Sequence, residues 1–114
     1  MSTLQGTWLP VRAELDGESA PSLALESMAF ILSEGGYQVS FGGEVYDSGT
    51  FTHTEAALSM TARQGPHAGR VISAIYQLMG DRLRICYALD GTAPLDFKTA
   101  PNSRRYLVTY RRQA

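Results

Sequence analysis

The dipeptide Gly80-Asp81 and its alternating flanks constrain the fold of this chain most strongly. Gly-Asp is a favoured pair for a two-residue turn between antiparallel strands. Folding the flanks back on each other places an apolar set on one face: Leu78 with Leu83, Tyr76 with Ile85, Ala74 with Tyr87 and Ile72 with Leu89. Because the buried face sets the register of a strand pair, this face is predicted to point into a core.

A second hairpin is predicted around Gly42-Gly43. Its inward pairs are Phe41 with Glu44, Val39 with Tyr46 and Tyr37 with Ser48. Gly49 interrupts the second strand, and an isolated glycine in a strand indicates a bulge or a corner. Beyond Gly49 the pattern leaves two alternatives open, with either Thr50 and Thr52 or Phe51 and His53 facing inward.

Four further strands are predicted, giving eight with the two hairpins. They lie near Thr7–Glu14, Met28–Ser33, Leu58–Arg63 and Arg105–Arg112. The segment Ser19–Glu26 breaks the alternation, and its early proline favours a short helical segment near residues 20–26. The chain is therefore predicted to be an all-β protein, an eight-stranded antiparallel up-and-down barrel that forms one domain over residues 1–114.

Composition excludes several classes of protein. The single cysteine, Cys86, cannot form an internal disulfide, no apolar run is long enough for a membrane span, and the N-terminus has no secretory signal pattern. A cytoplasmic protein is expected. Residues 1–57 hold eight acids and one base, net −7, and residues 58–114 hold nine bases and three acids, net +6. Barrel closure is expected to pair these charges, so no nucleic-acid partner is predicted.

The two ends of the chain resemble those of lipocalin-type (calycin-type) barrels. Gly6-Thr7-Trp8 lies on the first predicted strand, and Arg111 and Arg112 lie on the last. In such barrels the tryptophan plugs the closed end and a late arginine covers its ring. The resemblance therefore implies a buried Trp8 beneath Arg111 or Arg112.

Motifs along the chain narrow the resemblance to an uncharacterised family of small lipocalin-like bacterial domains, best known from planctomycetes. The matching segments are Leu4-Gln5-Gly6-Thr7-Trp8, Gly49-Thr50-Phe51, Gly65-Pro66 with Gly69, Ile75-Tyr76, the block from Gly80 to Tyr87, and Phe97-Lys98-Thr99. The resemblance implies a fold and carries over no activity.

Residues for covalent or metal chemistry are sparse. His53 and His67, with Glu55 near His53, lack the spacing of a metal site, and no metal or cofactor is predicted. Cys86 lies on the outward face of its hairpin without a histidine nearby, which favours a structural thiol. No motif of a nucleophilic hydrolase, a P-loop or a dinucleotide site occurs.

The predicted interior is the candidate site. Aromatic and apolar side chains face inward, and buried phenols need hydrogen-bond partners. The predicted ligand-binding residues are Tyr37, Phe41, Tyr46, Met60, Tyr76 and Tyr87. Three functions fit this pattern: a pocket for a small hydrophobic or aromatic molecule, a cofactor-free cyclase-type enzyme that folds its substrate in the cavity, and a protein-interaction domain with a filled core.

The outward face of the Gly80-Asp81 hairpin is unusually apolar. Val71, Ser73, Ile75, Cys86 and Ala88 lie together on it. Because a solvated strand face normally alternates to polar residues, a homodimer through Val71, Ile75 and Cys86 is expected.

Overall fold

A computed structural model describes residues 4–15, 17–19, 27–33, 35–65, 68–88, 94, 96–97, 99 and 104–113 of the 114-residue chain. These residues form nine strands and no helix. The strands are β1 (Gly6–Leu15), β2 (Glu18–Ser19), β3 (Met28–Ser33), β4 (Gly36–Phe41), β5 (Glu44–His53), β6 (Ala57–Gln64), β7 (Val71–Met79), β8 (Arg82–Ala88) and β9 (Arg105–Arg112). The helical segment predicted near residues 20–26 lies outside the described residues.

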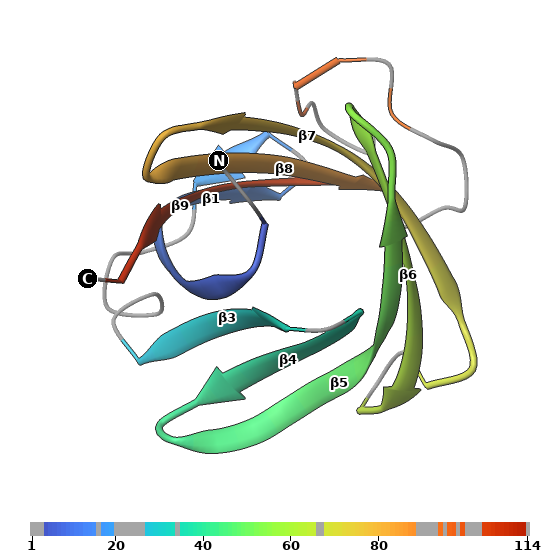
Figure 1. Ribbon diagram of the computed structural model, residues 1–114. Coiled ribbons are helices and arrows are strands. Elements are labelled where there is room, and N and C mark those ends of the chain that lie inside the picture. The colour runs from blue at the N-terminus through green and yellow to red at the C-terminus, as the bar shows by residue number, and fades with distance from the viewer. Residues whose placement is uncertain are drawn as a thin grey trace.

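The strands close into a barrel. Eight of them pair antiparallel in the order β1-β3-β4-β5-β6-β7-β8-β9, and pairing of β1 with β9 completes the ring. The two-residue β2 pairs only with the end of β1. Figure 1 shows the ring with the strands curving round a shared interior. The prediction of an all-β, eight-stranded antiparallel barrel is confirmed.

The β7–β8 hairpin has the predicted register. Leu78 pairs with Leu83, Tyr76 with Ile85 and Ala74 with Tyr87. The inward side chains Leu83, Ile85 and Tyr87 are all buried. Gly80 has a φ of 59°, the left-handed conformation that the turn requires and that glycine adopts without strain.

The β4–β5 hairpin departs from its predicted register after two pairs. Phe41 pairs with Glu44 and Ser40 with Val45, but Val39 then pairs with Asp47, so that Tyr46 is the extra residue of a β-bulge. A one-residue shift exchanges the two faces of a strand. The prediction that Tyr46 points inward is therefore wrong: Tyr46 is 61% exposed, and Asp47 is buried in its place. Phe41 lies at the rim and is 51% exposed.

Gly49 marks a tight corner, as its place in the strand predicted. The β5–β6 register shifts beside it, where Arg63 is the extra residue. A Cβ on Gly49 would overlap the Thr61 carbonyl group, so only glycine allows the strands to approach this closely. Beyond the corner Phe51 packs against the core, which decides between the two alternatives in favour of Phe51 and His53.

Trp8 is fully buried at one end of the barrel, here called the Trp8 end. Its indole Nε1 donates to the Leu4 carbonyl oxygen at 2.9 Å. The guanidinium carbon of Arg112 lies 4.3 Å from the ring centroid, in a cation–π arrangement. Arg112 Nη1 donates to the Gln5 carbonyl oxygen at 2.7 Å, and its Nε lies 3.5 Å from Asp81 Oδ1. Of the two predicted arginines, Arg112 covers the ring and Arg111 lies on the outward face.

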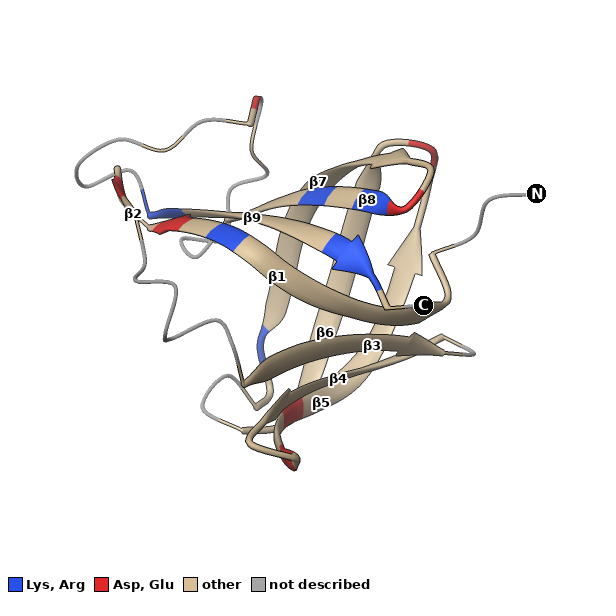
Figure 2. Ribbon diagram, turned by 90° about the vertical axis from the view of Figure 1, so that its left-hand side faces the viewer, with Lys and Arg blue, Asp and Glu red and all other residues tan. Residues whose placement is uncertain are grey.

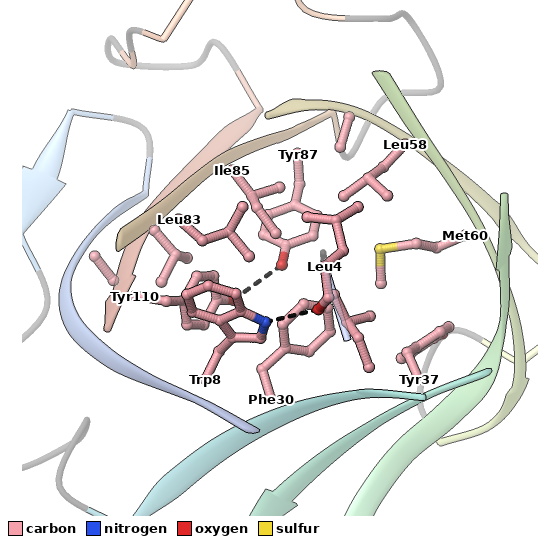
Figure 3. Close-up of a cluster of buried hydrophobic side chains, with 14 residues drawn as sticks. Leu4, Trp8, Phe30, Tyr37, Leu58, Met60, Leu83, Ile85, Tyr87 and Tyr110 are labelled. Atoms are coloured by element: carbon pink, nitrogen blue, oxygen red, sulfur yellow. Dashed lines mark hydrogen bonds between the residues drawn. The ribbon is translucent and has the colours of Figure 1, made fainter. Parts of the chain in front are cut away.

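Apolar and aromatic side chains fill the interior from all sides (Figure 3). The largest that are fully buried are Trp8, Tyr37, Phe30, Leu32, Leu83, Ile85 and Val108. The Phe30 ring stacks on Tyr110 with a centroid separation of 5.3 Å. Except for Trp8 at its end, these side chains occupy the middle of the barrel, and a pocket opens at each end.

The outer face of β8 is covered by the chain itself. The Phe97 ring lies 4.1 Å from the guanidinium carbon of Arg84. Two residues along the same face Cys86 is fully buried, although its side chain points outward as predicted. Val71 is exposed. A dimer through this face would therefore make its contacts through Val71 and Ile75, because Cys86 lies beneath the surface of its own chain.

The charged residues are distributed unequally over the strands of the barrel, as they are along the sequence. Arginines lie on β8, β9 and the adjoining β1, while β3 and β4 carry no charged residue (Figure 2). Within the described part of the chain the ion pair Arg112–Asp81 joins two residues of the basic half.

Candidate functional site

The interior contains an unusual number of phenols. Five of the six tyrosines lie on inward-facing strand positions: Tyr37, Tyr76, Tyr87, Tyr106 and Tyr110. The Tyr87 and Tyr110 hydroxyls share a buried hydrogen bond of 2.9 Å, drawn in Figure 3. Burial, followed by the proximity of Tyr110, raises the pKa of Tyr87 well above its ordinary value. Burial likewise raises the pKa of Tyr110. Both phenols are neutral hydrogen-bonding groups within an apolar core.

Tyr37 and Asp47 form the second polar contact of the interior. The Tyr37 hydroxyl donates to Asp47 Oδ1 at 3.4 Å. Burial, and then the carboxylate of Asp47, raise the pKa of Tyr37 to about 12. A buried carboxylate is costly unless it is hydrogen-bonded. Asp47 is there because the Tyr46 bulge reverses the strand's faces.

The six predicted ligand-binding residues separate into three groups. Tyr37, Met60 and Tyr87 are buried in the packed middle of the barrel. Tyr76 lines a pocket at the Trp8 end. Phe41 and Tyr46 line a pocket at the opposite end, beside the Gly42-Gly43 turn. The structure therefore does not gather them into one internal cavity, because core side chains separate the two ends.

The pocket at the end opposite Trp8, here called the open-end pocket, has a volume of about 540 Å³. Its lining residues are Met28, Val39, Phe41, Glu44, Val45 and Tyr46. Met28 and Val39 also pack against the core, so the pocket continues the barrel's apolar interior to the surface. Phe41, Val45 and Tyr46 are each more than half exposed. Large apolar side chains gathered in this way around a hollow are typical of binding sites.

Three interior residues, Asp47, Tyr106 and Tyr110, were not predicted from the sequence. The face of β9 could not be chosen from a strand that is apolar or aromatic on both sides, and pairing with β8 is what turns Tyr106 and Tyr110 inward. Asp47 became inward only through the bulge at Tyr46. No local sequence signal marks the bulge that turns Asp47 inward.

The described residues contain no group of three or more His, Cys, Asp or Glu side chains that could hold a metal ion. His53 lies at the Trp8 end, and His67 is outside the described residues. Cys86 is a free, buried thiol. Among the described elements there is also no helix of the length and apolarity that a membrane crossing requires.

Comparisons with known proteins identify no relative of this chain. No family model, no curated protein and no solved structure matches this chain.

Proposed function

We propose that this protein is a lipocalin-like barrel that binds a small hydrophobic or aromatic molecule in the open-end pocket. The observation that carries the proposal is the exposure of Phe41, Val45 and Tyr46 around one pocket, at 51%, 51% and 61%. Covering apolar surface contributes about 25 cal/mol per Å². A ligand lying across these three side chains would gain that contribution without rearranging the core.

The charge of the lining favours an uncharged ligand over an anion. Among the described residues, Glu44 is the only charged one that lines the pocket, and no described Lys or Arg does. The adjoining strands β3 and β4 are also without charge. An anionic headgroup would meet the Glu44 carboxylate with no compensating cation among the described lining residues, whereas a neutral ring meets Phe41 and Tyr46.

The assignment to lipocalin-like barrels is supported by the Trp8 end. A first-strand tryptophan lies beneath a last-strand arginine, and the ring of strands closes between the same two strands. Lipocalin-like barrels of eight strands are wide enough to hold one small ligand. In this chain the middle is packed, and binding is proposed at the mouth.

Fluorescence titration with the neutral probe N-phenyl-1-naphthylamine tests this function. Wild-type protein is expected to bind the probe, and Phe41→Ser and Tyr46→Ser each to weaken binding about tenfold or more, because one large ring is worth about 1.5–3 kcal/mol of burial. Val11→Ser on β1, at a site 55% exposed but outside the pocket, is the matched control and should bind like wild type. Equal loss in all three variants, or no binding by wild type, would refute the proposal.

A protein-interaction domain with a filled core is the second candidate. The paired hydroxyls of Tyr87 and Tyr110 favour it, since buried phenols that satisfy each other leave no polar group for a ligand. Failure of the probe to bind, together with unchanged stability on its addition, would favour this candidate. No contact among the described residues favours the cyclase-type enzyme.

A further inference from the structure

A second pocket, distinct from the open-end pocket, lies at the Trp8 end and is lined by three aromatic rings. Its volume is about 460 Å³. Phe51 and His53 come from alternate positions of β5, and Tyr76 comes from β7, two strands away in the ring of Figure 1. The remaining lining residues are Leu4, Gln5, Gly35 and Leu78.

The three rings stand at different angles round the hollow. The Phe51 and His53 centroids are 6.0 Å apart with planes tilted by 30°, and those of His53 and Tyr76 are 6.4 Å apart with planes at 75°. One carbonyl oxygen holds two of them: the Tyr76 hydroxyl donates to the Thr54 oxygen, and His53 Nδ1 lies 3.4 Å from it. Tyr76 and His53 are thus held at one carbonyl oxygen before any ligand binds, and Phe51 lies beside His53.

The electrostatics of this pocket favour positive charge. Aromatic faces carry negative charge density, and none of the described residues that line the pocket is Lys or Arg. Besides burial, the Glu55 carboxylate raises the pKa of the Tyr76 phenol, so a negative charge acts on this ring. The nearby Arg112 is already engaged by the Trp8 ring, the Gln5 carbonyl oxygen and Asp81.

We infer that the pocket formed by Phe51, His53 and Tyr76 binds a small organic cation, such as a trimethylammonium group. Aromatic cages recognise such groups by cation–π attraction combined with burial of their methyl groups. Leu4 and Leu78 provide apolar contact for those methyl groups, and the exposed Glu55 adds attraction at the rim. The inference does not depend on the open-end pocket, which lies at the other end of the barrel.

Calorimetric titration of the whole protein at about pH 8 tests the inference. Choline and its uncharged isostere 3,3-dimethyl-1-butanol have the same shape and differ in charge. Choline is expected to bind about tenfold more tightly, the preference that cation–π attraction can provide. Equal or tighter binding of the alcohol, or no heat from choline at millimolar concentrations, would overturn the inference.

Substitutions locate the site. Phe51→Leu and Tyr76→Leu should each weaken choline binding several-fold, whereas Tyr76→Phe keeps a ring and should retain it. Glu55→Gln should have a smaller effect because the carboxylate is exposed. Phe41→Leu, at the opposite end, is the control and should bind choline like wild type. Wild-type affinity in both leucine variants of the cage would place choline elsewhere and refute the site.

Discussion

At the scale of single residues, Trp8 is the side chain whose packing contributes most to the stability of its end of the barrel. It is fully buried, donates a hydrogen bond to Leu4 and lies beneath Arg112. Trp8→Ala should lower the free energy of unfolding by about 3–5 kcal/mol, the usual cost of truncating a large core side chain. Urea denaturation measures this, with exposed Leu9→Ala on the same strand as control. A loss no larger than that of the control would contradict the assignment.

The Tyr87–Tyr110 hydrogen bond gives a prediction for a pair of residues. Tyr87→Phe should cost about 1 kcal/mol, because it leaves the Tyr110 hydroxyl buried without its partner. Adding Tyr110→Phe should cost little more, since two apolar rings of the same shape leave nothing unsatisfied. Denaturation of both single variants and the double variant measures the coupling. Strictly additive losses would show that the hydroxyls do not depend on each other.

The phenols also predict a response to alkaline pH. The pKa of Tyr37 is raised from 10.0 to about 12, and the pKa values of Tyr76, Tyr87, Tyr106 and Tyr110 are raised as well. A tyrosine with a raised native pKa keeps its proton in the folded state after the unfolded chain has lost it. Unfolding therefore becomes more favourable as pH rises above 10, and well below that pH ionisation of these phenols does not alter stability.

Absorbance of tyrosinate measured beside far-UV circular dichroism checks the alkaline response. Most of the tyrosinate signal should appear together with unfolding, between about pH 10 and 12. Ionisation of all six tyrosines near pH 10 in a protein that remains folded would contradict the claim that the interior phenols are buried and hydrogen-bonded.

At the scale of elements, the two hairpins show what a sequence pattern can and cannot determine. The β7–β8 register followed from the turn pair and from one wholly apolar face. The predicted β4–β5 register was wrong from Tyr46 onward. Both Tyr46 and Val45 are acceptable on either face of the strand, and no neighbouring residue disfavours a bulge there. The barrel was therefore predictable, whereas the rim position of Tyr46 and the inward turn of Asp47 were not.

Gly49 gives a prediction for the β5–β6 corner. In Gly49→Ala the new methyl group would overlap the Thr61 carbonyl, so the strands must separate, at a cost of about 2–3 kcal/mol. Gly36→Ala on β4 is a matched control, because its Cβ would make ordinary contacts of 3.4 and 3.5 Å. Thermal denaturation should separate the two variants clearly. Equal melting temperatures would show that the corner can relax.

At the scale of the whole molecule, closure of the ring and the place of Trp8 followed from the sequence, but the division into two end pockets did not. That division depends on how far core side chains such as Phe30, Tyr87 and Tyr110 extend across the barrel, which no strand pattern encodes. The six predicted site residues were consequently spread over both ends and the middle. The homodimer through Val71, Ile75 and Cys86 stays a prediction.

Sedimentation addresses that dimer. If the outer face of β7 associates with a second copy, wild-type protein should sediment as a dimer at high micromolar concentration, and Ile75→Lys should convert it to a folded monomer. Val11→Lys, which also adds charge at an exposed valine, is the control. A monomeric wild type would end the proposal.

The central claim, that the open-end pocket is the binding site for a small apolar molecule, is tested most directly by two-dimensional amide NMR during a titration with N-phenyl-1-naphthylamine. We predict saturable chemical-shift changes in residues 39–46 and in Met28, which border this pocket, and small changes in Phe51, His53 and Tyr76 at the Trp8 end. Shifts centred on the Trp8 end, or no saturable shifts at any described residue, would contradict the account.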